Sequence, residues 1–195
     1  MSARQAGGRE TEILAVALER FSRSGYRDTT LQDIADEIGI TRPAFYHYFA
    51  SKEDLLWRLV EDLGLRLLDE ARPIAASNAE PLTKIRLLVH NHVITLVANT
   101  AAFRIYLQER ALLEGERDER LRREEDEYAR VVRTVITEAQ ASSVVRTGDP
   151  SVLALLLLGL GNSVLRWYTN IPGGLSPAQL AEEVATTVLS GLRGK

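Results

Sequence analysis

Two short helical patterns, separated by a single glycine, constrain this chain more than any other feature. They lie between Thr29 and Leu55, in the sequence TTLQDIADEIGITRPAFYHYFASKEDL. The first pattern places four apolar side chains on one face at helical spacing: Leu31, Ile34, Ala35 and Ile38. Gly39 follows, and glycine adopts without strain the backbone conformation that a tight helix-to-helix turn requires. The pattern predicts two short helices joined by such a turn.

The second helix of the pair is expected from Thr41 to Tyr48. The Thr41 hydroxyl can cap its first turn, and Pro43 suits that turn because no intrahelical donor is needed there. Two short helices joined in this way form a helix-turn-helix, whose second helix fits the major groove of DNA. The sequence therefore predicts a sequence-specific DNA-binding regulator.

The residues around this pair resemble the DNA-binding domain of TetR-family bacterial transcriptional repressors. The resemblance covers residues 9–59 and rests on short motifs: Gly25-Tyr26, Thr29-Thr30, Ile34-Ala35, Gly39-Ile40, Phe45-Tyr46-His47-Tyr48-Phe49 and Ser51-Lys52-Glu53-Asp54-Leu55. It implies an all-α, nine-helix fold of two domains. Residues 1–51 form the N-terminal three-helix DNA-binding head, and residues 52–195 the C-terminal body that binds an effector and dimerises.

Apolar periodicity and capping residues agree with an all-α fold, because no segment alternates as a strand does. Outside the helix pair, the expected helices cover residues 9–24, 51–72, 82–99, 102–112, 115–141, 150–168 and 177–192. Ser51, Asp149 and Ser176 each precede one of these helices and predict its N-cap. Pro73 is expected to end the helix that starts after Ser51.

By the resemblance, the exposed start of the recognition helix consists of Thr41, Arg42, Pro43 and Ala44. Arg42 is the best base reader, because its guanidinium can donate two hydrogen bonds to guanine. Pro43 or Ala44 suits a thymine methyl group. The remaining predicted contacts go to phosphates: Thr29, Thr30, Tyr46, His47, Tyr48 and Lys52. Packing within the head is the alternative for Tyr46 and Tyr48, and Phe45 and Phe49 are expected to form its core pair.

The charge of the chain runs against a simple DNA-binding interpretation. The formal net charge is −3, and residues 1–60 contain eight Lys or Arg and nine Asp or Glu. Phosphate contacts normally require a basic surface. We therefore expect the acids of the head, such as Asp33, Asp36 and Glu37, to face away from the duplex.

The remaining composition argues for a cytoplasmic regulator with no cofactor and no catalytic activity. The chain has no cysteine, which excludes disulfides and thiolate chemistry. The longest apolar run, Val152 to Gly161, is about half the length of a membrane span. His90 and His92 are two residues apart, so they diverge on a helix and cannot hold a metal ion together. Gly159-Leu160-Gly161 lacks the third glycine and the preceding strand of a dinucleotide site.

The helix that follows Asp149 is apolar almost all round, so it must be covered on every side. A second subunit is the expected cover, giving a two-fold homodimer that reads a palindromic operator in double-stranded DNA. The predicted interface consists of Leu156, Gly159, Leu160, Val164, Leu180, Val184 and Val188. A central core helix in a monomer is the alternative.

The resemblance also implies a small-molecule pocket in the body, whose occupation moves the helix that starts at Lys52. The candidate lining residues are His92, Leu96, Phe103, Leu107 and Trp167. A lone histidine on an apolar stripe is more often a satisfied core residue. Two segments, Phe103–Glu109 and Arg166–Pro177, resemble a branch that responds to acyl-CoA thioesters. An acyl-CoA, another apolar compound and no effector all stay open, as do the roles of Arg104 and Arg166 and the choice between repressor and activator.

Overall fold

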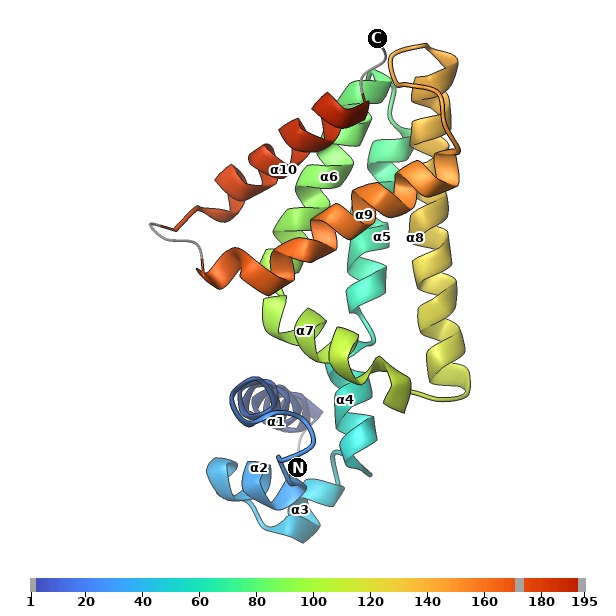
Figure 1. Cartoon of the computed structure of the whole chain (residues 1–195). Coiled ribbons are helices and arrows are strands. Elements are labelled where there is room, and N and C mark those ends of the chain that lie inside the picture. Colours follow the sequence, from blue (N-terminus) through green and yellow to red (C-terminus); the bar gives the residue numbers. More distant parts are fainter. Residues whose placement is uncertain (1–2, 171–173, 193–195) are drawn as a thin grey trace. The chain divides into compact units, whose positions relative to one another are not determined.

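The computed structural model describes residues 3–170 and 174–192, with side chains described from residue 8 onward. Within these ranges the chain is all-α, as predicted (Figure 1). The α-helices are α1 (Ala3–Ser24), α2 (Leu31–Ile38), α3 (Arg42–Tyr46), α4 (Lys52–Val60), α5 (Leu63–Ala76), α6 (Pro81–Ala98), α7 (Thr100–Glu109), α8 (Glu116–Ala141), α9 (Pro150–Trp167) and α10 (Pro177–Leu192). Two single-turn 3₁₀ helices, η1 (Arg110–Leu112) and η2 (Tyr168–Asn170), follow α7 and α9.

One predicted helix is two helices in the structure. The helix expected from Ser51 to Arg72 is interrupted after Val60, where Glu61 and Asp62 form a turn, and it resumes as α5. Pro73 does not end α5, which continues to Ala76. Because Pro73 has no N–H, the Asp69 carbonyl lacks its helical donor, and α5 ends within one turn after the proline. The described residues therefore contain ten α-helices where nine were expected.

The chain divides into two compact units that differ from a simple N-terminal and C-terminal division. Unit 1 consists of residues 1–62 and 101–119, and unit 2 of residues 63–100 and 120–195. Unit 1 therefore contains α4, most of α7, η1 and the start of α8 in addition to the three helices of the predicted head. The functional boundary between residues 51 and 52 stays a prediction.

The core of unit 1 forms where α1 packs against α2 and α4, while α2 also packs against α3 (Figure 1). Its apolar side chains are buried at helical spacing: Ile13, Ala17, Phe21, Ile34, Ala35, Phe45, Phe49 and Leu55. Phe45 and Phe49 have ring centroids 5.9 Å apart, so the predicted core pair is confirmed.

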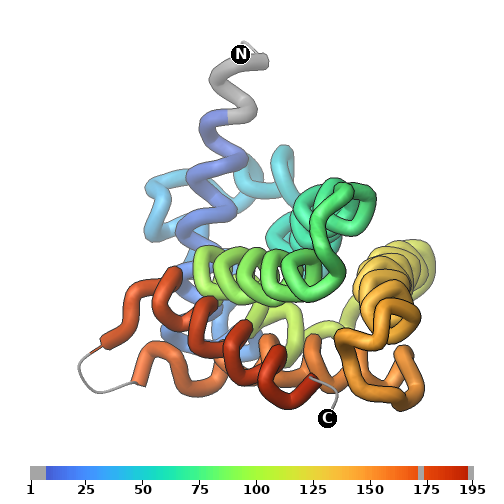
Figure 2. Tube along the Cα trace, turned by 90° about the horizontal axis from the view of Figure 1, so that it is seen from above, coloured from blue at the N-terminus to red at the C-terminus, as the bar shows by residue number. Residues whose placement is uncertain are grey.

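Unit 2 is organised around α6, which packs against α5, α9 and α10. Figure 2 shows α10 lying alongside α6, where its apolar stripe is buried. The α6 stripe is also buried and consists of Ile85, Leu88, Val89, His92, Val93 and Leu96. The capping residues predicted for this part of the chain are confirmed, because Asp149 accepts from Ser151 N and Ser176 exchanges hydrogen bonds with Gln179.

The two glycines of α9 have different environments. Gly161 is buried, and a Cβ at this position would overlap the ring of His92 on α6. Gly159 is exposed, and a Cβ there would meet no atom within 4 Å. Gly161 is therefore required for the close approach of α9 to α6, and Gly159 is not required for the packing of the single chain.

We predict that Gly161→Ala lowers the free energy of unfolding by about 1–3 kcal/mol, because the added methyl group displaces a buried ring. Gly8→Ala, at an exposed glycine of α1 where a Cβ would meet no atom within 4 Å, is the control and should be neutral or stabilising by about 0.5–1 kcal/mol. Urea unfolding followed by circular dichroism measures both. Equal stability of the two variants would contradict the close-packing role of Gly161.

Candidate nucleic-acid interface

A complete capping box fixes the start of α2. Thr30 Oγ1 accepts from Asp33 N at 3.1 Å, and the Asp33 carboxylate accepts from Thr30 N at 2.8 Å and from the Thr30 hydroxyl at 2.7 Å. These hydrogen bonds hold the pKa of Asp33 below its usual range. The Thr30 hydroxyl proton therefore goes to Asp33, so we remove Thr30 from the predicted phosphate donors.

The turn between α2 and α3 depends on Gly39. Its φ of 74° lies in the left-handed region, and its N–H bonds to Asp36 O at 3.2 Å. Ile40 N then bonds to Ala35 O at 3.0 Å, which closes the end of α2. A residue with a Cβ would be strained in this conformation. The geometry confirms the predicted turn of the helix-turn-helix.

The recognition helix α3 is short and presents an outer face of polar and cationic groups. Thr41 caps it by accepting from Ala44 N at 3.4 Å, so its hydroxyl proton is left to donate outward. Phe45 is fully buried and fixes the rotation of α3 about its axis. This rotation leaves five side chains exposed and one half-buried: Thr41, Arg42, Pro43, Tyr46 and His47, with Ala44 between them.

Arg42 and Tyr46 are neighbours on this outer face. Arg42 Nη2 donates to the Tyr46 hydroxyl at 3.2 Å, and the guanidinium carbon lies 5.7 Å from the centre of the Tyr46 ring. Tyr46 is 43% exposed, which places it outside the core that Phe45 and Phe49 occupy. The pair presents a cation and a hydroxyl together at the surface of α3, a combination that suits a base edge and an adjacent phosphate.

Two other predicted phosphate contacts are engaged inside the head. Thr29 is 2% exposed, and its hydroxyl donates to Gly25 O at 2.8 Å, so it cannot reach DNA. The ammonium group of Lys52 donates to Arg27 O at 3.2 Å and lies 4.3 Å from the centre of the Tyr26 ring. Burial lowers the pKa of Lys52. We therefore expect Lys52 to contribute less to phosphate binding than the side chains of α3. Tyr48 is half-buried.

The acids of the head are bound within it. Glu37 pairs with Arg20, Asp33 belongs to the capping box, and Asp36 accepts from Gln32 at 2.6 Å. Residues 40–50, which form α3 and its flanks, contain no Asp or Glu. The charge that faces a duplex from α3 is therefore positive, although the chain as a whole is acidic.

The predicted effector residues are not brought together in one compact unit. Phe103 and Leu107 belong to unit 1, where Leu107 is 54% exposed. His92, Leu96 and Trp167 belong to unit 2, where Trp167 is 40% exposed. The polar partners of His92 were not predicted from the sequence. Two signals point to them: Tyr128 is the one aromatic residue of the long charged helix α8, and Asn162 is a polar residue within the apolar helix α9.

His92 is the centre of a buried polar cluster in unit 2. With Nε2 protonated, it donates to Asn162 Oδ1 at 3.1 Å, and its Nδ1 accepts from the Tyr128 hydroxyl at 3.0 Å. The His92 and Tyr128 rings are stacked, with centroids 5.6 Å apart. Burial lowers the pKa of His92 to about 4 and raises the pKa of Tyr128. The residues around this cluster close it so tightly that no water molecule fits: Leu67, Glu70, Ala71, Leu88 and Asn91.

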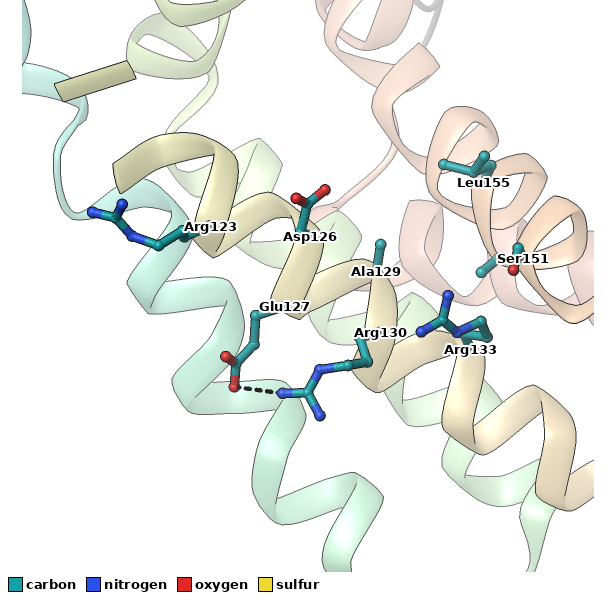
Figure 3. A pocket seen from close by; sticks show the side chains of 9 residues that line it. Arg123, Asp126, Glu127, Ala129, Arg130, Arg133, Ser151 and Leu155 are labelled. Atoms are coloured by element: carbon teal, nitrogen blue, oxygen red, sulfur yellow. Dashed lines mark ion pairs between the residues drawn. The ribbon is translucent and has the colours of Figure 1, made fainter. Parts of the chain in front are cut away.

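A groove of about 550 Å³ lies between α8 and α9 (Figure 3). The α8 side contributes arginines, of which Arg130 pairs with Glu127 at 3.3 Å. The other two are Arg123 and Arg133, and Arg133 lies near Ser151 at the start of α9 (Figure 3). Leu155, which is 63% exposed, completes the groove on the α9 side. The groove thus presents three arginines and an apolar wall, together with the carboxylates of Asp126 and Glu127.

One face of α9 is apolar and exposed. Its large side chains are between 39% and 63% exposed: Val152, Leu155, Leu156, Leu160 and Trp167. Of the predicted interface residues, Leu156, Gly159 and Leu160 lie on this face. The other four, Val164, Leu180, Val184 and Val188, are buried within the single chain, and their part in an interface stays a prediction. The apolar stripe of α10 is buried within the same chain, where α10 packs against α6.

By length and composition alone, residues 150–170 could cross a membrane, with a mean hydropathy of 1.4 and a third of the segment buried. The apolar run Val152–Gly161 in the sequence is shorter than this segment and so underestimates its length. A helix that packs on a core with one face and on a partner with the other has the same composition.

We predict that the free energy of unfolding falls as the pH is lowered, because of His92. The imidazole is neutral in the folded chain down to a pKa of about 4, whereas in the unfolded chain it takes up a proton near pH 6.5. The unfolded state therefore binds more protons between these values, and stability is lost by roughly 3 kcal/mol over this range. Urea unfolding at a series of pH values measures the slope. His92→Gln should abolish it, and His47→Gln, at an exposed histidine, should retain it.

Comparison with known proteins matches nearly the whole chain. A family model described as "Bacterial regulatory proteins, tetR family" matches residues 13–59, and one described as "Tetracyclin repressor-like, C-terminal domain" matches residues 78–192. The HTH-type transcriptional repressor KstR2 of Rhodococcus jostii is 30% identical over 188 residues, covering 95% of this chain and 91% of that protein.

Two solved structures have the same fold and cover most of the chain. A transcriptional regulator of the TetR/AcrR family from Thermobifida fusca has a TM-score of 0.73 at 35% identity, covering 96% of this chain and 100% of its own. The ketosteroid transcriptional regulator KstR2 of Mycobacterium tuberculosis has a TM-score of 0.86 at 27% identity, covering 96% of both chains.

Proposed function

The chain belongs to the TetR family of bacterial transcriptional regulators, and on this premise we propose that it is a dimeric, effector-released repressor. It binds a palindromic operator in the cytoplasm through α3 and leaves the operator when a small apolar compound binds to the body. The outer face of α3 carries the proposal, because it combines exposed Arg42, Tyr46 and His47 with the absence of acids from residues 40–50.

The proposed DNA contacts have distinct roles. Arg42 reads a guanine edge through its guanidinium, and Ala44 or Pro43 contacts a thymine methyl group. Thr41, Tyr46 and His47 donate to phosphates, and these contacts fix the register of α3 in the groove. Half-buried Tyr48 and Lys52 lie at the edge of this set.

We predict that Arg42→Ala relaxes sequence preference, because one bidentate base contact accounts for about 1–3 kcal/mol of discrimination. The measurement is fluorescence anisotropy on labelled DNA from upstream of the protein's own coding region, with operator and scrambled duplexes as competitors. Arg66→Ala, which removes the same charge from an exposed position on α5, is the control and should keep the wild-type preference. Full selectivity in Arg42→Ala would show that α3 reads bases through other residues.

A dimer follows from the exposed apolar face of α9. Leu155 and Leu156 are each more than 60% exposed, and a contiguous apolar face of this kind marks an interaction surface. A second copy is the proposed partner, because a two-fold dimer presents two α3 helices to the two halves of a palindrome. The glycine at position 159 lies on the same face and allows a partner helix to approach closely.

We predict that Leu156→Glu weakens dimerisation by about 100-fold or more, because it buries a charge at the centre of the interface. Sedimentation velocity at several protein concentrations measures the change. Leu107→Glu places the same charge at a comparably exposed leucine on α7 and should leave the dimer intact. A dimer that resists Leu156→Glu would place the interface elsewhere.

The effector is proposed to be an apolar compound with at least one oxygen that accepts or donates a hydrogen bond. One M. tuberculosis relative is named a ketosteroid regulator. The buried His92–Tyr128 pair would offer polar groups to a carbonyl or hydroxyl when a bound ligand opens the closed space around the pair and replaces its mutual hydrogen bond. An acyl-CoA is the other proposed class. It needs cations for its phosphates beside an apolar wall, and Arg123, Arg133 and Leu155 provide both in the groove between α8 and α9. Release of labelled operator DNA by steroid-derived compounds or by acyl-CoAs distinguishes the two classes.

A further inference from the structure

Unit 1 contains a segment that is distant from the DNA-binding helices in sequence. Residues 101–119 form most of α7, η1 and the first residues of α8, and they belong to the same compact unit as residues 1–62. The chain leaves unit 1 after residue 62, returns at residue 101 and leaves again after residue 119. The polar contacts of this segment fall on the first turn of α4 and on the residues before α2.

Arg117 makes the main contact. Its Nη2 bonds to Asp54 Oδ1 at 2.6 Å, and its Nη1 donates to the Glu53 carbonyl at 3.4 Å. The guanidinium carbon lies 5.6 Å from the centre of the Trp57 ring, which is itself buried. One side chain thus engages three residues of α4. A planar guanidinium suits this combination of a carboxylate, a carbonyl and an aromatic face, whereas an ammonium group does not.

Asp54 extends this contact toward the recognition helix. Its second carboxylate oxygen accepts from Ala50 N at 3.3 Å, while its own N–H bonds to the cap, Ser51 Oγ, at 3.0 Å. Ala50 directly follows Phe49, the core partner of Phe45 in α3. A single carboxylate therefore joins Arg117 to the backbone that leads out of the recognition helix.

Glu109 makes a second contact from the same segment. Its carboxylate lies 3.9 Å from the Arg27 guanidinium and is only 13% exposed. Burial, followed by the charges of Glu53 and Glu109, raises the pKa of Tyr26, whose ring lies against Lys52. The segment therefore contacts the head at two places, at Glu109 in its middle and at Arg117 near its end.

We infer that Arg117 is a positioning residue for DNA recognition: through Asp54 it fixes the first turn of α4 and, with it, the exit of α3. The DNA consequence rests on the proposed function. α8 continues without a break from Arg117 in unit 1 to Ala141 in unit 2.

The first test measures the clamp without DNA, in the full chain. Amide hydrogen exchange of residues 52–57 should be about three- to tenfold faster in Arg117→Gln, the size expected for a partly exposed ion pair with an aromatic contact. Arg66→Gln removes the same charge from an exposed position on α5 and should leave this exchange unchanged. Arg117→Lys keeps the charge beside Asp54 and should restore part of the protection. A circular dichroism melt confirms that each variant is folded.

The second test uses duplexes that the wild-type protein selects from a random DNA pool. Arg117→Gln and Asp54→Asn should each bind them about three- to tenfold more weakly, and the double variant should bind no more weakly than the worse single variant. Additive losses, or unchanged affinity together with unchanged exchange, overturn the inference. If the wild-type protein selects no sequence, the proposed function fails, and the exchange of residues 52–57 still decides the clamp.

Discussion

The burial of Phe45 is the interaction on which the DNA-reading surface depends. A helix of five residues forms too few internal hydrogen bonds to be stable alone, so α3 needs an anchor in the core. Phe45 is fully buried against Phe49, a burial that contributes about 2–3 kcal/mol. It also sets the rotation of α3. Once Phe45 faces inward, helical geometry places Arg42 and Tyr46 outward, where their guanidinium and hydroxyl meet.

The acidic net charge of the chain is compatible with a DNA-binding surface because charge is distributed locally. Each carboxylate of α2 has a partner: Asp33 caps the helix, Glu37 pairs with Arg20, and Asp36 accepts from Gln32. The Asp54 carboxylate accepts from two donors, the Ala50 N–H and the Arg117 guanidinium. Charged groups engaged in this way stabilise the head. They leave α3 and its flanks without a carboxylate, so the ionic charge there comes from Arg42.

The body combines a buried polar cluster with an exposed apolar helix face, the reverse of the usual distribution. The cluster is tolerated because His92, Tyr128 and Asn162 satisfy one another, and a buried polar group without a partner would cost far more. The exposed face of α9 has no such compensation within one chain. The exposed face is explained when a second copy covers it, as proposed above.

Local chemistry by itself determined the helical class, the capped helix ends and the orientation of α3, but not the break after Val60 or the end of α5. Caps such as Thr41 and Ser176, the turn at Gly39, and the Phe45–Phe49 spacing act within a few residues, so they can be read from the sequence. Which neighbour covers a given face depends on residues far apart in the chain. The tertiary structure alone decided that Thr29 is buried while Thr41 is exposed, that α10 packs against α6, and that Arg117 reaches α4. Periodicity defines an apolar face, but only packing selects its partner.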